Sequence, residues 1–163
     1  CKIAGLPKLR RAYFNSGFAE GWGLYSEGLG RELDLYTDPY SRFGRLMMDA
    51  HRACRLVIDT GLHGMGWARE RAIGYLVEHA LLERGFAEAE VDRYIVWPGQ
   101  ATAYKIGEQR ILALREKAKA ALGERFDIRR FHNAVLDHGA LPLETLDRVI
   151  GEWIEAEKAR AKG

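Results

Sequence analysis

Apolar residues in the first part of the chain recur at helical spacing. Phe14, Phe18, Trp22, Tyr25, Leu29 and Leu33 follow one another at steps of four, four, three, four and four residues. These steps match one face of an α-helix, so the pattern predicts a helix over about 14–33. Asp38 and Pro39 then have the residue types of an N-cap and a first helical position, and they predict a second helix that ends near Gly61.

The remaining apolar runs predict further helices over 67–84, 87–95, 98–122 and 126–136, and a last one that begins at 141–143. Glycines at 85 and 123 suit helix ends. No alternation of apolar and polar residues extends beyond three or four positions, so no substantial sheet is expected. The sequence predicts an all-α fold, an irregular bundle of about six to seven helices, organised as a single helical domain over 1–163.

Composition narrows the class of protein. The 163 residues are 47% hydrophobic, enough for one sizeable core. The 25 Lys and Arg residues against 23 Asp and Glu give a net charge of +2, and the basic residues are dispersed, which argues against a nucleic-acid partner. No apolar run approaches the ~18 residues of a membrane span. Cys54 lies in an apolar helical pattern, which favours a buried thiol.

The first predicted helix is rich in glycine, at positions 17, 21, 23, 28 and 30. Each interior glycine costs about 1 kcal/mol relative to alanine. Glu20 and Glu27 are seven residues apart and share the face opposite the aromatic stripe, with the glycines beside them. We therefore expect another backbone to approach closely and both carboxylates to be partly buried. The alternatives are a metal-ligating carboxylate and a surface pair salt-bridged to arginines such as Arg31.

Residues 18–27, Phe-Ala-Glu-Gly-Trp-Gly-Leu-Tyr-Ser-Glu, resemble the Glu-Gly-Trp-Ala-Leu-Tyr-x-Glu segment of the bacterial family called domain of unknown function 885. Further stretches agree in order, at 55–63, 93–94, 98–107, 131–132 and 139–143. The resemblance therefore spans nearly the whole chain. It is specific for the family and much less specific for an activity.

The resemblance implies a helical zinc metallopeptidase, in which a His-Glu-x-x-His helix provides two metal ligands and the catalytic base. A later glutamate completes the three protein ligands and leaves one position for water. This implies that Glu20 is the metal ligand, with Glu27 as its supporting neighbour or substitute. The histidines are His51, His63, His79, His132 and His138, and no two are four residues apart, so the zinc site is incomplete here. We expect the chain to be the C-terminal part of a longer protein, inactive by itself and without its own zinc.

Related metallopeptidases use a tyrosine and a histidine to donate hydrogen bonds to the oxyanion of the tetrahedral intermediate. The resemblance places these roles on Tyr104 and on His63, which we expect on a glycine-flanked loop. Arg55, Arg93 and Gln100 are the candidate substrate-binding residues. The alternatives are a core tyrosine, a capping histidine and a structural ion-pair network that includes both arginines.

The expected partners follow from these assignments. The parent protein would bind Zn²⁺ and a peptide substrate, and this chain would pack against the missing N-terminal domain. The alternative is a non-catalytic helical interaction module, which would associate or form a homodimer through an exposed apolar or glycine-lined face. The compartment stays open, with export expected if a signal peptide lies upstream.

Overall fold

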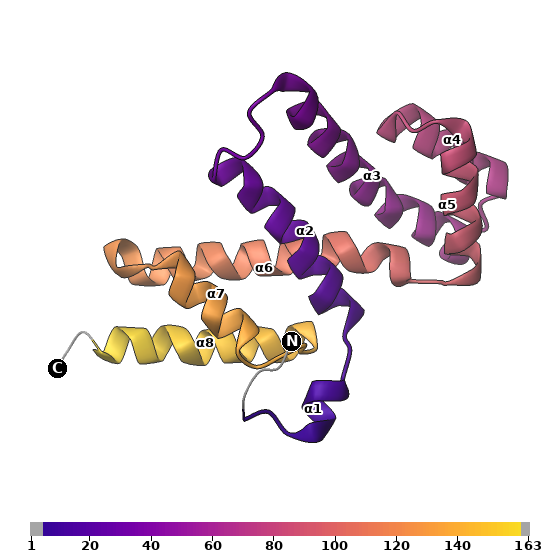
Figure 1. Ribbon diagram of the computed structural model, residues 1–163. Helices are drawn as coiled ribbons and strands as arrows, with labels where there is room; N and C mark the ends of the chain where they lie inside the picture. The colour runs from indigo at the N-terminus through magenta and orange to yellow at the C-terminus, as the bar shows by residue number, and fades with distance from the viewer. Residues whose placement is uncertain (1–4, 161–163) are drawn as a thin grey trace. The chain divides into compact units, whose positions relative to one another are not determined.

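The computed structural model describes residues 5–160, and the secondary structure of this part is helical throughout (Figure 1). The α-helices are α1 (Lys8–Ala12), α2 (Ser16–Glu32), α3 (Pro39–Gly64), α4 (Arg69–Ala80), α5 (Arg84–Val96), α6 (Gln100–Leu122), α7 (Ile128–Leu136) and α8 (Leu143–Ala159). A 3₁₀ turn, Gly123–Arg125, follows α6. The described residues contain no strand, so the predicted all-α class is confirmed.

The chain divides into two compact units. One, the split unit, combines Cys1–Trp22 with Gly107–Gly163, and the other, the central unit, is Gly23–Ile106. Helices α2 and α6 contribute residues to both. The expectation of a single helical domain over 1–163 stays a prediction.

Both ends of α2 differ from the prediction of a helix over 14–33. The side chain of Asn15 accepts a hydrogen bond from the amide of Phe18 at 2.9 Å, so the helix begins after Phe14. At the other end Asp34 adopts the left-handed conformation, with a φ of 52°, and the helix ends at Glu32. Phe14 and Leu33 are each 67% exposed, whereas Phe18 and Tyr25 are buried. The apolar stripe is thus covered only in its middle.

Helix α3 begins where the sequence predicted and ends later. Asp38 accepts hydrogen bonds from the amides of Tyr40 and Ser41 at 2.9 and 3.0 Å, which confirms it as the N-cap. The predicted end at Gly61 is wrong, because the helix continues to Gly64. A side chain at Gly61 would collide with the indole of Trp67, which packs against the helix there. Gly61 therefore makes room for an aromatic ring and does not stop the helix.

Helices α4 and α5 meet at a different place from the one predicted. Helix α4 was expected over 67–84, but Leu81 adopts a left-handed φ of 53° and the helix ends at Ala80. The side chain of Glu83 then accepts a hydrogen bond from the amide of Phe86 at 3.0 Å and caps α5, which begins at Arg84. A side-chain cap thus starts the new helix at Arg84, and Gly85, which was expected to end the preceding helix, lies in the first turn of α5.

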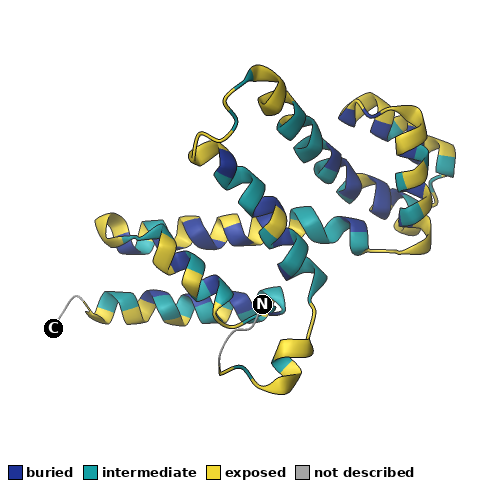
Figure 2. Ribbon diagram, in the orientation of Figure 1, coloured by how far each residue is buried: buried dark blue, intermediate teal, exposed yellow. Residues whose placement is uncertain are grey.

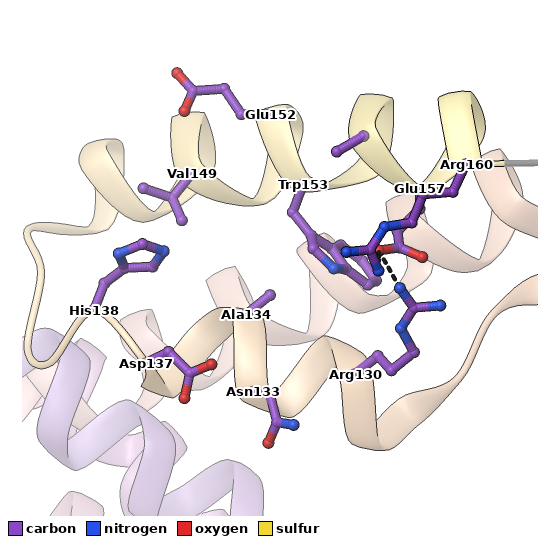
Figure 3. A pocket seen from close by; sticks show the side chains of 11 residues that line it. Arg130, Asn133, Ala134, Asp137, His138, Val149, Glu152, Trp153, Glu157 and Arg160 are labelled. Carbon is purple, nitrogen blue, oxygen red and sulfur yellow. Dashed lines mark hydrogen bonds and ion pairs between the residues drawn. The ribbon is translucent and has the colours of Figure 1, made fainter. Parts of the chain in front are cut away.

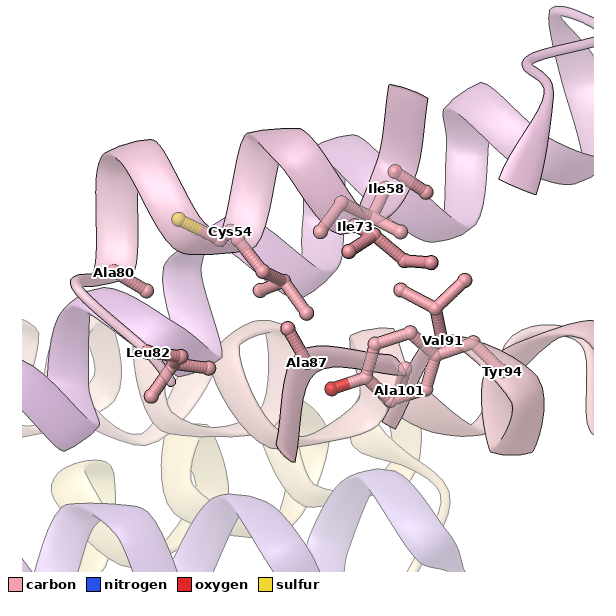
Figure 4. Packing of buried hydrophobic residues seen from close by; sticks show 11 residues of the cluster. Cys54, Ile58, Ile73, Ala80, Leu82, Ala87, Val91, Tyr94 and Ala101 are labelled. Carbon is pink, nitrogen blue, oxygen red and sulfur yellow. The ribbon is translucent and has the colours of Figure 1, made fainter. Parts of the chain in front are cut away.

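The core of the central unit lies where α3, α4 and α5 pack together (Figure 4). Its buried residues are Cys54, Ile58, Ala72, Ile73, Leu76, Ala80, Leu82, Ala87, Val91, Tyr94 and Ala101. Truncating a fully buried side chain such as Leu76 to alanine costs about 2–5 kcal/mol, so this cluster accounts for much of the unit's stability. Cys54 is 7% exposed, which confirms the predicted buried thiol, and this burial raises its pKa. Figure 2 shows the burial along α3 concentrated in its second half.

In the split unit, α7 and α8 pack on each other, with Phe131, Val135, Leu146 and Ile150 fully buried. This unit also contains a close crossing of backbones. A Cβ on Gly21 would collide with the backbone of Gly107, and a Cβ on Gly107 would collide with the carbonyl of Gly17. The predicted close approach is confirmed at this pair of glycines. It lies to one side of the glutamate face, and Gly23 faces open space.

Candidate functional site

The central unit holds a dense polar cluster centred on Glu90 of α5. Its Oε2 accepts hydrogen bonds from the Tyr94 hydroxyl at 2.6 Å, from Arg55 Nη2 at 2.8 Å and from Arg93 Nη2 at 3.0 Å. The Glu90 side chain is only 16% exposed. Two guanidinium groups therefore pair with one largely buried carboxylate, whose burial requires such partners. We call this set the Glu90 cluster: His51 and Arg55 from α3, Glu90, Arg93 and Tyr94 from α5, and Gln100 and Tyr104 from α6.

His51 joins the cluster from α3 and is fully buried. Its Nε2 lies 3.0 Å from the Tyr94 hydroxyl and 3.4 Å from Glu90 Oε2. Because the Tyr94 hydroxyl gives its own hydrogen to Glu90, it accepts one from His51, so Nε2 carries the proton. Burial lowers the pKa of His51 more than its contact with Glu90 raises it, so the ring is neutral at pH 7.

The ionisation states in the cluster follow from burial and hydrogen bonding. Burial pushes the pKa of Glu90 upward, but hydrogen bonds from His51, Arg93 and Tyr94 outweigh it and hold that pKa far below its ordinary value. Burial, opposed by Arg55, raises the pKa of the Tyr94 hydroxyl well above its ordinary value. At neutral pH Glu90 is therefore ionised and the Tyr94 hydroxyl keeps its proton. Neither is suited to exchange a proton near neutral pH.

The structure brings all three candidate substrate-binding residues into this cluster. Arg55 Nε donates to the Tyr94 hydroxyl at 2.9 Å, and the guanidinium lies 4.6 Å from the centre of the Tyr104 ring. Arg93 Nη1 donates to Gln100 Oε1 at 2.8 Å. The ion-pair network considered as the alternative for both arginines is present, with Glu90 as its carboxylate. A role in substrate binding stays a prediction.

The two candidate oxyanion donors have different surroundings. The Tyr104 hydroxyl accepts a hydrogen bond from Gln100 Nε2 at 3.4 Å, so its own hydrogen stays available to donate. His63 lies in the last turn of α3, so its expected place on a loop is wrong. Its side chain is exposed, and Nε2 lies 3.0 Å from the backbone oxygen of Tyr94. No hydrogen bond joins His63 to Tyr104 in the part of the chain that the structure describes.

Sequence reasoning missed Glu90, the centre of the cluster. The available signal was the spacing of Glu90, Arg93 and Tyr94, which are three and four residues apart on one helix. A second connection was missed at Asp59, whose two carboxylate oxygens accept the Gly99 amide at 3.0 and 3.1 Å. Gly99 has a φ of 80°, a conformation that favours glycine. The hydrogen bond to Asp59 therefore stabilises the turn just before α6.

The two candidate metal-site glutamates lie on α2 but belong to different units. Glu20, in the split unit, is half-buried and next to the glycine at the backbone crossing. Glu27, in the central unit, is 42% exposed, and its carboxylate lies 3.9 Å from Arg52 rather than beside Arg31. Across residues 5–160, no three His, Cys, Asp or Glu side chains gather closely enough to hold a metal ion. These residues by themselves do not form a zinc site.

A cavity of about 480 Å³ lies between α7 and α8 in the split unit (Figure 3). Trp153 and His138 contribute to its lining, and Arg130 and Arg160 both pair with Glu157. The charges around Glu157 are therefore compensated within the chain. None of the residues predicted for catalysis or metal binding lines this cavity.

Comparison with known families decides the classification. The family described as "Bacterial protein of unknown function (DUF885)" matches residues 2–150. The chain belongs to this family. The resemblance noted from the Glu-Gly-Trp-Gly-Leu-Tyr segment is thereby confirmed at the level of the family. A search of curated proteins finds no match.

Two solved structures are similar to this DUF885 chain. A protein described as a "putative lipoprotein" from Colwellia psychrerythraea is 46% identical, with a TM-score of 0.93 over 95% of this chain and 27% of that one. A protein described in the same way, of unknown function, from Shewanella oneidensis is 24% identical, with a TM-score of 0.83 over 90% and 27%. The second likeness shows the fold alone. This chain spans about a quarter of the length of these relatives. No helix within residues 5–160 is long and apolar enough to cross a membrane.

Proposed function

We propose that this chain forms part of a zinc-dependent hydrolase that cleaves peptide bonds, and that Glu20 is one ligand of the metal. The observation that carries the proposal is the family segment 18–27, which places Glu20 on α2 beside the backbone crossing at Gly21 and Gly107. A ligand has to be held within a fraction of an ångström, and a helix locked by backbone contact provides such a support. A half-buried carboxylate also suits a metal that excludes water.

The described residues supply only this one ligand, so the proposal requires the other ligands to come from the rest of a longer parent protein. When bound, zinc would lower the pKa of a coordinated water to about 7. Within this chain, Tyr104 and His63 are the proposed hydrogen-bond donors to the substrate carbonyl. The Glu90 cluster orients Tyr104, because Arg55 stacks on its ring and Gln100 bonds its hydroxyl. On this proposal Arg55, Arg93 and Gln100 position Tyr104 and the peptide.

The test is the metal content and peptidase activity of the full-length parent purified with zinc supplied. Glu20→Gln removes the ligand charge with little change in volume, and we expect loss of both zinc and activity. Glu78→Gln is the matched control, since Glu78 is 79% exposed on α4, and it should retain both. Circular dichroism checks that each variant folds. A wild-type parent that binds no zinc, or a Glu20→Gln variant that keeps it, contradicts the proposal.

A second candidate function is that of a non-catalytic interaction module. Large apolar side chains that are more than half exposed gather along the connection from α2 to α3 and the first turns of α3: Leu33, Leu35, Tyr40, Phe43 and Leu46. Such concentrations are typical of surfaces that contact another protein. This function predicts self-association that Phe43→Ser weakens, measured by light scattering across concentrations. A strict monomer at every concentration counts against it.

A further inference from the structure

The connection between α2 and α3 is held against α2 and forms one wall of a cavity in the central unit. The ring of Tyr36 lies so close to α2 that a Cβ on Gly30 would come within 2.9–3.0 Å of its atoms. The Tyr36 hydroxyl donates a hydrogen bond to the backbone oxygen of Glu27 at 3.1 Å. The amide of Leu35 also bonds to the oxygen of Gly30 at 2.9 Å. These contacts hold the connection folded back along the helix.

A cavity of about 340 Å³ opens beside this wall. It is lined by Arg31, Asp34, Tyr36, Arg42, Arg45 and Leu46, and we call it the arginine cavity. Three guanidinium groups face one carboxylate there, so the lining carries a net charge of +2, three minus one. In the described part of the chain Asp34 forms no ion pair with these arginines. None of the three guanidinium groups therefore has a carboxylate of the described residues in direct contact.

The hydrogen bonds of the arginines leave most of their donors unused. Arg42 Nε donates to the backbone oxygen of Tyr36 at 2.9 Å, which fixes that guanidinium at the wall. Arg45 Nε is buried and has no partner within the described residues, and Arg31 makes no hydrogen bond there. Because Nε is enclosed, the donors open to a ligand are the Arg45 Nη groups and the Arg31 guanidinium, which also have no acceptor within the described residues and which an anion would satisfy. The cavity therefore presents hydrogen-bond donors for which the described residues supply no acceptor.

We propose that the arginine cavity binds the phosphate group of a small phosphate ester. Guanidinium groups present parallel donors that match the oxygens of phosphate. A lining charge of +2 complements a phosphate dianion more closely than a singly charged carboxylate. Tyr36 and Leu46 give the ligand's organic part an apolar wall. The site is independent of the zinc proposal, since it uses neither Glu20 nor the Glu90 cluster.

The same chemistry would recognise free phosphate, a soluble ester or a lipid headgroup, so the experiment has three arms on the intact protein. Isothermal titration uses inorganic phosphate and phenyl phosphate, and co-sedimentation uses phosphatidylcholine vesicles with and without phosphatidic acid. We expect saturable binding in at least one arm. For the soluble probes it should be weaker at about pH 5 than at about pH 8, because the second pKa of phosphate is about 6.

Arg45→Gln should weaken the observed binding by about tenfold or more, since it removes a charged group whose Nη donors have no acceptor within the described residues. Arg31→Gln is a second variant, because this exposed side chain makes no hydrogen bond whose loss would unfold the protein. Arg148→Gln on α8 is the matched control, with the same change of charge and a 68% exposed side chain, and should bind like the wild type. Absence of saturable binding in all three arms overturns the proposal. So does an equal loss in Arg148→Gln, or an affinity for acetate equal to that for phosphate.

Discussion

The Glu90 cluster and the arginine cavity lie in the same unit and use arginine in opposite ways. In the cluster Arg55 is 6% exposed, and its charge is compensated by Glu90 at 2.8 Å. In the cavity Arg45 has a buried Nε that no group in the described chain accepts. The cluster also contains buried atoms without a hydrogen-bond partner in the described chain, Arg55 Nη1 and His51 Nδ1, so the two sites differ in the carboxylate: Glu90 pairs with Arg55, whereas no carboxylate of the described residues pairs with an arginine of the cavity. The comparison shows that an arginine paired with a carboxylate of the chain serves the structure, whereas an arginine without such a pair is a candidate for ligand binding.

The largest effect is expected from Glu90→Gln, which removes the carboxylate and leaves Arg55 and Arg93 uncompensated. Breaking a buried ion pair costs about 3–5 kcal/mol. Because Glu90 is 16% exposed, we expect the lower end of that range. Urea unfolding measures the loss, with Glu78→Gln as the exposed control within about 0.5 kcal/mol of wild type. Equal stability of the two variants would remove the distinction between the cluster and an ordinary surface.

Tyr94→Phe is the next largest expected change. The hydroxyl serves three partners, since it donates to Glu90 and accepts from Arg55 and His51. Its loss leaves buried donors without an acceptor, at a cost of about 1–3 kcal/mol. Tyr40→Phe is the control, because Tyr40 is 88% exposed, and its free energy of unfolding should not change. A Tyr94→Phe variant as stable as wild type would show that the hydroxyl does not hold the cluster together.

Acidification should weaken the cluster in two stages. The folded pKa values of His51 and Glu90 both lie below their ordinary values of 6.5 and 4.5. The unfolded chain therefore takes up protons first, and the stabilisation present at neutral pH declines as the pH falls below 6.5 and then below 4.5. His51→Phe should abolish the first stage and leave the second. Urea unfolding at a series of pH values checks this, and an unchanged first stage in the variant would assign it to another group.

The smallest effect is expected from Arg45→Met in the arginine cavity. Since its Nε has no partner in the described chain, the change removes no ion pair, and we expect a stability within about 0.5 kcal/mol of wild type. Arg55→Met in the cluster should instead lose several times that amount, because Glu90 remains buried with less compensation. Thermal unfolding of the two variants side by side measures the contrast. A similar loss in both would mean that the cavity arginine also serves the fold.

The sequence by itself determined the helical class, the family and several local features. Helical periodicity and the Asp38 cap depend on neighbours within a few residues, so a linear pattern contains them. The burial of Cys54 was predicted from its place in an apolar helical pattern, and α4 and α5 provide the residues that bury it. The close approach at Gly21 was also foreseen, because a glycine-rich helix face allows another backbone to come close, although Gly23 on the same helix faces open space. Their partner, Gly107, could not be inferred from spacing along the chain.

Only the tertiary structure decided which polar groups meet. Glu90 looked like any helical glutamate until packing brought Arg55 from 35 positions away to its carboxylate. His63 was expected on a loop but lies in the last turn of α3. Gly61 makes room for the Trp67 ring, and the helix continues past it. Arg45 shares a cavity with Asp34, yet no ion pair joins it to a carboxylate within residues 5–160. Charge compensation depends on distances in space, and those are set by which helices bury their apolar faces together.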